Sequence, residues 1–411
     1  MKSDSSVKFA AAAAAALFAF GAPALAGDKP LAEGTAVGDA LRPWLESGEL
    51  PGAVSVVYDG ATGREQVACM GWADVDAERA VTLDTPFMQC SQTKGFCGVT
   101  VAILVEEGLV SLDDPVSKFL PEFKNLWVKQ SETNGVRTFV AATNALTLRM
   151  VMNHTGGFPF EIPAKQAGIP GGGWSGGMPV RSVAATAASQ PLNFQPGTKT
   201  QYSNTGIDIG AAVVQTVTGM PWDRFLAERV LEPLGMTETR FKPTPEQIAL
   251  HMEMYDCHKD APATYRVQND WEQRPYDGDH VFPSAGAGLW TTARDQLKFY
   301  RMIMNGGVGD NGVRILKEET VRDVLAVSSR PAGMGGYSLG LNVTQDGWVG
   351  HGGAFGTNCM VDIAKKRLKL WVVQLSGGPR PWDKARDKAV DAFFAEALDN
   401  AGSDAYTGRV E

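Results

Sequence analysis

The chain has 411 residues, of which 44% are hydrophobic and 20% are charged, with 46 glycines and 23 prolines. This is the composition of a globular protein, long enough to form one large domain or two modest ones. The formal net charge is −8 and no face-sized block of lysine or arginine occurs, which argues against nucleic-acid binding through a basic surface.

The first 26 residues, MKSDSSVKFAAAAAAALFAFGAPALA, have the pattern of a secretory signal peptide. Lys2 and Lys8 give a positive start, residues 9–20 are apolar, and residues 24–26 (ALA) offer the small-x-small pattern after which signal peptidases cut. An apolar run of about a dozen residues is too short to cross a bilayer as a helix, and no second long apolar segment follows. We therefore expect an exported protein, periplasmic or extracellular, without a membrane anchor in its mature form.

After the signal, the sequence predicts a helix, two strands and then a helix that is apolar on nearly all its faces. These four elements are expected over residues 34–50, 51–60, 65–74 and 92–107. Gly108 follows the last of them in the way that helix-ending glycines do. Residues 110–305 have a mostly helical pattern, interrupted by long polar or glycine-rich loops.

Strand patterns return in the last part of the chain. A capping box over residues 292–295 (TARD) predicts a helix that ends at the glycines 306 and 307. Three strands are then expected at residues 337–343, 347–353 and 368–376, and a final helix at about 382–399. Strands at both ends imply one sheet built from both termini, in a lobe of about residues 27–88 and 285–400. The helical lobe, about residues 89–284, is inserted between them, and a cleft between the lobes is the expected place for a site.

The sequence contains five cysteines, an odd number for an exported protein, so at least one is unpaired or pairs between chains. Cys90 and Cys97 are seven residues apart on a predicted helix, a rise of about 10 Å that is too long for a disulfide, so buried thiols are the simpler interpretation. We predict no metal and no cofactor. The loose group of His251, Asp256, Cys257 and His258 fits loop chemistry better than metal ligation.

The stretch MQCSQTKGFCG, residues 88–98, places Lys94 three residues after Ser91 at the start of the buried helix. Serine is a favoured N-cap, but a capping box has Glu or Gln at the position that Lys94 takes, and a cation there opposes the helix dipole. Residues three apart share a helix face, and burial at the positive helix end favours a neutral, basic amine. The pattern predicts Ser91 as a nucleophile with Lys94 as its base.

Two other serines satisfy similar patterns. Residues 5–8 (SSVK) repeat the S-x-x-K spacing inside the signal peptide, where it has no catalytic meaning. Residues 173–177 (GWSGG) match G-x-S-x-G around Ser175, but a nucleophile elbow needs a strand before it and a helix after it. Here a glycine-rich loop precedes the serine and Met-Pro follows it. We interpret residues 168–179, with Trp174, as a loop that either edges the cleft or shapes an acyl pocket.

Tyr202-Ser203-Asn204 is the only Y-x-N in the sequence, and it lies between a turn and an apolar helix. A tyrosine placed there can exchange a proton with the oxygen of Ser91, and an amide two residues on can hold a substrate carbonyl. These two positions are therefore candidate site residues.

His351-Gly352-Gly353 lies on a predicted strand, where glycines let a ligand come close to the backbone. His154-Thr155-Gly156 is similar in letters, but it ends a predicted helix and precedes Tyr202 in the chain. We interpret His351 as the candidate site residue and His154 as structural.

The three motifs in this order, S-x-x-K, Y-x-N and a basic residue-x-Gly, resemble those of the serine β-lactamase and penicillin-binding-protein superfamily. The similarity is to the class C β-lactamase-related branch, with its D,D-peptidases, D-aminopeptidases and family VIII esterases. Further segments resemble the family in the family's order and cover most of residues 40–376, among them LVEEGLVSLDDPVSKFLPEF, LTLRMVMNHTGGFP and GLWTTARDQLKF. The resemblance implies an α+β, β-lactamase-like fold, in which an antiparallel sheet is flanked by the N- and C-terminal helices and an all-α lobe is inserted.

The resemblance also implies roles for the candidate residues. Ser91 would attack a carbonyl, and Lys94 and Tyr202 would share the base role. Asn204 and His351 would contact the substrate.

The oxyanion would be held by the backbone N–H groups of Ser91 and of Ala354, which follows Gly353. The implied reaction is acyl transfer to water through an acyl-serine.

The substrate is expected to be a small ester, an amide or a D-amino-acid peptide. Class C β-lactamases usually carry Lys-Thr-Gly at the third motif, whereas His351-Gly352 lacks the hydroxyl and carries a charge only part of the time near neutral pH. Efficient cephalosporin turnover is therefore not expected, and an esterase or a peptidase acting on D-amino-acid peptides has at least as much support as a true β-lactamase, which stays an alternative. A non-catalytic penicillin-binding or sensor protein is a further alternative, although such a protein would be expected to have lost Ser91, Lys94 or Tyr202.

Overall fold

The computed structural model describes residues 29–162, 179–257, 265–266, 282–378 and 380–404. The predicted signal peptide, Trp174, Ser175 and His258 lie outside these residues, so the interpretations made for them stay predictions.

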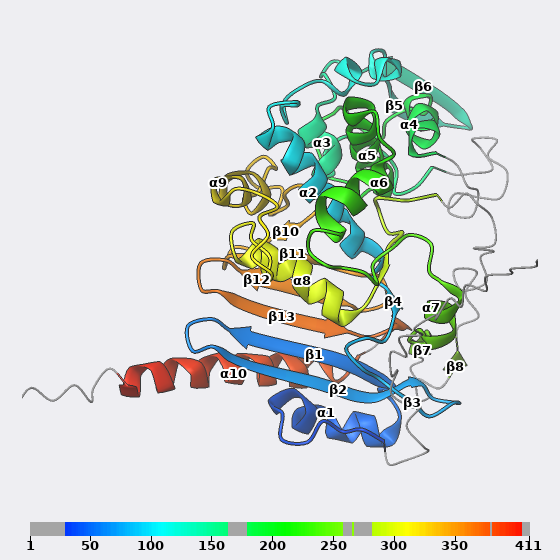
Figure 1. The fold of residues 1–411 in the computed structure, drawn as a ribbon. Helices are drawn as coiled ribbons and strands as arrows, with labels where there is room; N and C mark the ends of the chain where they lie inside the picture. The colour runs from blue at the N-terminus through cyan, green and yellow to red at the C-terminus, as the bar shows by residue number, and fades with distance from the viewer. Residues whose placement is uncertain (1–28, 163–178, 258–264, 267–281, 379, 405–411) are drawn as a thin grey trace, which may run out of the picture.

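A seven-stranded antiparallel sheet contains segments from both ends of the chain (Figure 1). Its order is β10-β11-β12-β13-β1-β2-β3. The bounds are β1 (Gly52–Asp59), β2 (Arg64–Asp74), β3 (Arg79–Ala80), β10 (Asn342–Val343), β11 (Trp348–Gly352), β12 (Asn358–Asp362) and β13 (Arg367–Val372). The two halves meet where β1 pairs with β13, with Val56 opposite Leu370. The prediction of one sheet built from both termini is confirmed.

Helices cover both faces of this sheet, because the strands alternate apolar residues toward each side. Val54 and Val56 of β1 belong to the core on one face, whereas Ala53 and Val57 belong to the core on the other. The terminal helices α1 (Ala36–Ser47) and α10 (Asp383–Asp404) pack together under the second face, and α8 (Ala293–Met304) lies on the first (Figure 1). Thr292 caps α8 by accepting from the N–H of Asp295, which confirms the predicted start of the helix. The reciprocal half of the predicted capping box is not formed, because the Asp295 carboxylate accepts from the N–H of Glu238 and from Lys298 instead.

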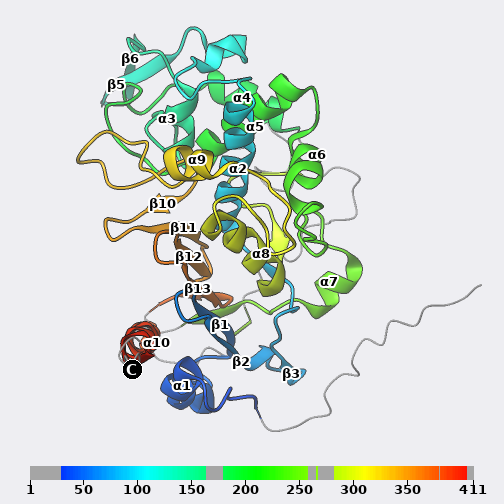
Figure 2. The same ribbon diagram turned by 60° about the vertical axis from the view of Figure 1, so that its left-hand side comes forward.

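The helical part of the molecule lies above the first face and packs around α2 (Thr93–Glu106), the buried helix that the sequence predicts (Figure 2). Its other helices are α3 (Leu148–Met152), α4 (Val180–Ala188), α5 (Asn204–Thr218), α6 (Trp222–Leu226) and α7 (Pro245–Leu250), with α9 (Glu318–Thr320) nearby. Short helical turns complete it: η1 (Cys90–Gln92), η2 (Val116–Lys118), η3 (Pro121–Phe123), η4 (Ala227–Leu231) and η5 (Val321–Leu325). None of the helices in the described part of the chain is long and apolar enough to cross a membrane.

The expectation of an all-α lobe was incomplete, because two strands form a hairpin there. β5 (Trp127–Thr133) and β6 (Val136–Ala141) pair across Asn134 and Gly135, both of which have positive φ. Asn-Gly is the usual loop of a two-residue hairpin. The strands lacked the apolar alternation that marks a half-buried strand, since most of their residues are exposed.

Three further differences concern short strands. The predicted strand at 337–343 is reduced to the two residues of β10, and β12, which the prediction missed, lies between β11 and β13. The predicted strand at 368–376 is divided into β13 and β14 (Leu375–Gly377). The remaining short strands are β4 (Phe87–Met88), which pairs with β9 (Trp290–Thr291), and β7 (Tyr255–Cys257) and β8 (Tyr265–Arg266), which join β14.

Candidate active site

Ser91 lies in η1, between β4 and α2, and not at the N-cap of α2. The N-cap is Gln92, and no side chain caps the helix there. The turn is entered through Cys90, which has a φ of +50°, an uncommon conformation for a residue other than glycine. The hydroxyl of Ser91 is therefore not used for helix capping, which was the structural alternative for this residue.

Lys94 is fully buried, and its Nζ makes three short contacts. It lies 3.1 Å from the Oγ of Ser91, and it donates across 2.6 Å to Asn204 Oδ1 and across 2.6 Å to the carbonyl of Gly286. Burial lowers the pKa of Lys94 from 10.5 to about 7, although Asp208 nearby acts in the opposite direction. A substantial fraction of the amine is therefore neutral near pH 7, as a base for Ser91 requires.

Tyr202 is on the loop that leads into α5, where Ser203 is the N-cap and accepts from the N–H of Gly206. The hydroxyl of Tyr202 interacts with the side chain of Ser91, and it lies 3.4 Å from His351 Nε2. Although 37% of the tyrosine is exposed, the removal of this hydroxyl from water raises the pKa of Tyr202 to about 12. Tyr202 therefore keeps its proton and is a donor near neutral pH.

Asn204 is the first residue of α5, and both ends of its amide have partners. Oδ1 accepts from Lys94, and Nδ2 donates to Glu161 Oε1 across 3.1 Å. A lysine can only donate and a carboxylate accepts, so these two partners fix which end of the amide is oxygen. The expected contact between Asn204 and a substrate carbonyl stays a prediction.

His351 lies on β11 and is only 5% exposed. Its Nδ1 lies 2.6 Å from the carbonyl of Gly352, which only accepts, so Nδ1 carries the proton. Nε2 is then an acceptor, and the hydroxyl of Tyr337 lies 3.0 Å from it. Burial and the nearby Lys94 lower the pKa of His351 from 6.5 to about 3. The expectation of a part-time charge near neutral pH was wrong, because the imidazole is buried in a neutral form.

The segment after β11, residues 353–355, packs directly against the turn that holds Ser91. Gly353 donates to the carbonyl of Thr357 across 2.7 Å. A Cβ on Gly353 would lie 2.6 Å from the carbonyl oxygen of Gln89 and would also overlap Thr357, so only glycine fits. The backbone N–H groups of Ala354 and its neighbour Phe355 face the thiol of Cys90. Ala354 therefore lies beside the turn that holds Ser91, and its role in holding an oxyanion stays a prediction.

His154 supports the loop that carries Tyr202. It has a φ of +67° and is buried, and its Nδ1 accepts from the backbone N–H of Ser203 across 3.2 Å. Its ring packs against the rings of Tyr202 and Tyr337, at 4.5 and 4.6 Å between centroids. These contacts agree with the structural interpretation of His154.

The site contains residues that the sequence analysis missed: Phe160, Glu161, Asp208, Gly286 and Tyr337. Asp208 gives a signal that could have been used, since it is a carboxylate in an otherwise apolar helix, one turn after Asn204. The others come from segments whose proximity is decided only by the fold.

The cysteines near the site are thiols. Cys69, Cys90, Cys97 and Cys359 are all free thiols. Cys69 is partly buried and the other three are buried. Burial raises the pKa of Cys90 to about 12. Within the described residues, no group of three or more His, Cys, Asp or Glu side chains is placed to hold a metal ion.

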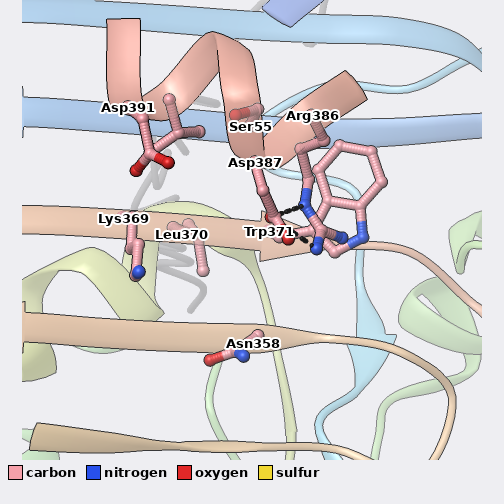
Figure 3. Close-up of a pocket in the computed structure, with 9 residues that line it drawn as sticks. Ser55, Asn358, Lys369, Leu370, Trp371, Arg386, Asp387 and Asp391 are labelled. Atoms are coloured by element: carbon pink, nitrogen blue, oxygen red, sulfur yellow. Dashed lines mark hydrogen bonds and ion pairs between the residues drawn. The ribbon is translucent and has the colours of Figure 1, made fainter. Parts of the chain in front are cut away.

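A cavity of about 210 Å³ lies on the face of the sheet that α10 covers (Figure 3). Lys369 and Trp371 of β13 and Arg386 and Asp387 of α10 are among its lining residues, and none of the catalytic candidates is. This cavity is separate from the site around Ser91.

Comparison with protein-family models matches residues 37–395 to the Beta-lactamase family. Protein Rv1367c of Mycobacterium tuberculosis is 30% identical over 341 residues, which cover 80% of this chain and 79% of the relative. This chain belongs to the beta-lactamase family. Members of the superfamily are serine hydrolases that include esterases, acyltransferases and peptidases.

Two other proteins are similar to this chain. A putative D-alanyl-D-alanine carboxypeptidase of Escherichia coli is 27% identical over 324 residues, covering 72% of this chain and 70% of the relative. The crystal structure of a family VIII carboxylesterase superposes with a TM-score of 0.64 and 19% identity, covering 87% of this chain and 96% of the esterase. At that identity the superposition shows the shared fold alone.

Proposed function

We propose that this beta-lactamase-family protein is an exported serine hydrolase that cleaves an ester without a free carboxylate, through an acyl-serine intermediate. The observation that carries the proposal is the contact between Lys94 Nζ and Ser91 Oγ, made by a buried lysine whose pKa is lowered to about 7. Export is supported by the signal-like pattern of residues 1–26.

The proposed reaction uses the groups in sequence. Ser91 Oγ attacks the ester carbonyl while its proton passes to neutral Lys94. The backbone N–H groups of Ser91 and Ala354 hold the oxyanion, a contribution worth on the order of 3 kcal/mol per donor in other serine hydrolases. As the tetrahedral intermediate collapses, the C–O bond to the alcohol breaks, and the alkoxide takes a proton from Tyr202, which Lys94 replaces.

The second half of the reaction returns the enzyme to its starting state. A water molecule gives its proton to Lys94, which is neutral again after its proton has passed to Tyr202, and attacks the acyl carbon. The bond to Ser91 Oγ then breaks, the serine takes back a proton, and the carboxylic acid leaves.

Charge supports an uncharged substrate. In the described part of the chain, no side chain with a fixed positive charge contacts Ser91, Tyr202, Asn204 or His351. The only amine there is Lys94, which is buried, and His351 is neutral at physiological pH. A substrate carboxylate would therefore gain little binding energy at this position, whereas an uncharged ester does not need a cation to bind.

A ring beside the catalytic tyrosine supports an apolar substrate. Phe160 is 50% exposed and stacks on Tyr202 with ring centroids 6.1 Å apart. The carbonyl of Phe160 accepts from the N–H of Asn204 across 2.8 Å, and this bond holds Phe160 against the start of α5. An exposed ring held in this way offers a contact surface for an alkyl or aryl group.

A D,D-carboxypeptidase is the second candidate. The Escherichia coli relative favours it, and so does Arg380, whose guanidinium packs against Gly356, two residues after Ala354. Such an enzyme must bind a terminal carboxylate, and Arg380 would be the cation to do so. Arg380→Ala would then abolish peptide cleavage and spare ester cleavage.

The test compares three substrates on the purified mature protein: p-nitrophenyl butyrate, nitrocefin and a peptide that ends in D-Ala-D-Ala. We expect turnover of the ester well above that of nitrocefin, loss of turnover in Ser91→Ala, and an acyl adduct on Ser91 by mass spectrometry. A nitrocefin rate comparable to the ester rate would overturn the substrate proposal. A fluorophosphonate that leaves Ser91 unlabelled would overturn the mechanism.

A further inference from the structure

A carboxylate outside the three motifs is built into the Lys94 site. Asp208 lies on α5, one helical turn after Asn204, and is only 4% exposed. Its Oδ1 accepts from the N–H of Ala285 across 2.7 Å, from the N–H of Gly286 across 3.2 Å and from the hydroxyl of Ser284 across 3.2 Å. Three donors on one oxygen hold the segment 284–286 against α5.

This segment supplies a ligand of Lys94. The carbonyl of Gly286 accepts from Lys94 Nζ across 2.6 Å, while the N–H of the same residue is bonded to Asp208. A Cβ on Gly286 would lie within 2.7–2.9 Å of atoms of the Asn204 side chain, so the segment is in close contact with that residue as well. Asn204 and Asp208 thus hold the lysine from adjacent turns of α5, one directly and the other through a single residue, Gly286.

We infer that Asp208 is the buried counter-charge of Lys94, a positioning residue that fixes the Gly286 carbonyl and sets how readily the lysine takes up a proton. The inference rests on the proposed role of Lys94 as the base. It assigns a task to a carboxylate whose burial would otherwise only destabilise the fold.

The charges around Lys94 come from several elements. Asp208 on α5 and Glu161 on the preceding loop favour the ammonium, as would the thiolate of Cys90 in η1. Lys94 in turn disfavours the charged forms of His154 and of His351 on β11. Asp208 is first among the charges that raise the pKa of Lys94, whereas burial raises the pKa of the Asp208 carboxyl to about 7. Since the two groups interact closely, the apparent pKa values seen in a titration describe the pair and not either residue alone.

The test is the pH dependence of kcat/KM for p-nitrophenyl butyrate in the wild type and in Asp208→Asn. Oδ1 of asparagine can accept the same three hydrogen bonds, so the variant removes the charge and keeps the shape. Without the negative charge, Lys94 loses its proton more easily and stays neutral to lower pH. At low pH kcat/KM should fall as Lys94 takes up a proton; we call this part of the profile the acid limb, with its midpoint near pH 7 in the wild type. In Asp208→Asn we expect this midpoint to move to lower pH by about one unit, the size of shift that a nearby charge produces.

Two further variants separate this role from a merely structural one. Ser284→Ala removes one donor to Asp208, which makes the carboxylate less stable, so a smaller shift in the same direction is expected. Asp113→Asn is the matched control, because Asp113 is an exposed carboxylate paired with Arg149, and it should leave the limb in place. An unmoved acid limb in Asp208→Asn would overturn the inference, as would an equal shift in Asp113→Asn.

A separate measurement shows whether the proposed function itself fails. The rate of Ser91 labelling by a fluorophosphonate, measured against pH, needs no substrate and should show the same shift. If Ser91 does not react at any pH, the proposed function fails. The proton affinity of Lys94 is then read by NMR titration of protein labelled with ¹⁵N-lysine, with Lys94→Met to assign the signal, and an unchanged value in Asp208→Asn would overturn the inference.

Discussion

The hydroxyl of Tyr337 lies 3.0 Å from Nε2 of His351, whose Nδ1–H is directed at the carbonyl of Gly352. The imidazole is thus held in one tautomer, neutral, with its accepting nitrogen toward the two tyrosines at 337 and 202. The third motif of this chain therefore presents a hydrogen-bond acceptor where Lys-Thr-Gly would present a cation and a hydroxyl.

Tyr337→Phe removes the shorter of the two hydrogen bonds to His351. The free energy of unfolding should fall by about 1 kcal/mol, the usual net contribution of one hydrogen bond, because Tyr202 can still donate to Nε2 of His351. Tyr202 should then turn its hydroxyl toward His351 and away from Ser91, which lowers kcat by an estimated tenfold if a bond worth about 1.4 kcal/mol is lost. Urea denaturation and steady-state kinetics measure the two effects. Tyr58→Phe, at a partly exposed tyrosine on β1, is the control, and an equal loss there would contradict the prediction.

Lys94→Met should change how stability depends on pH. Because burial lowers the pKa of Lys94 from 10.5 to about 7, the unfolded chain binds more protons than the folded chain between these values. The free energy of unfolding of the wild type therefore rises with pH in that window. Relative to Lys94→Met, the rise between pH 7 and pH 9 should be about 2 kcal/mol. Parallel stability curves for the two proteins would contradict the lowered pKa.

Phe160→Ala should weaken the selection of apolar esters. If the exposed ring contacts the substrate, each methylene that it covers contributes about 0.8 kcal/mol, or about fourfold in kcat/KM. The preference for p-nitrophenyl hexanoate over the acetate should then fall by at least about fourfold. Val313→Ala, at another exposed apolar residue, should leave the preference unchanged. If both variants keep the wild-type preference, Phe160 is not a substrate contact.

Gly352 and Gly353 should respond differently to a methyl group, although they are neighbours in the third motif. A Cβ on Gly352 would have one contact, at 3.4 Å from the carbonyl of Thr357, whereas a Cβ on Gly353 would collide with Thr357 and Gln89. Gly353→Ala should move Ala354 away from the Ser91 turn and lower kcat by about 10²–10³, the effect of losing an oxyanion donor. Gly352→Ala is the matched control and should stay close to wild type in kcat. Similar losses in both variants would show that the packing against Gln89 does not matter.

Local patterns predicted much of the fold and the main candidate residues. α1, β1, β2, α2, α8 and α10 were predicted within a few residues, because their apolar periodicity and caps are strong. The predictions were least accurate for β10, which is reduced to two residues, and for the β5–β6 hairpin, whose exposed strands have no apolar face. The spacing of Ser91 and Lys94 could be interpreted because residues three apart on a helix share a face.

The sequence by itself determined the family and the candidate residues, and predicted the kind of chemistry, because S-x-x-K, Y-x-N and His-x-Gly are short spacings that local structure preserves. Only the tertiary structure decided the charges at the site. It enclosed Lys94 with Asp208 and the Gly286 carbonyl, and it placed His351 against Tyr337, where burial keeps the imidazole neutral. A pKa depends on desolvation and on partners that are distant in the sequence, so spacing alone could not predict it.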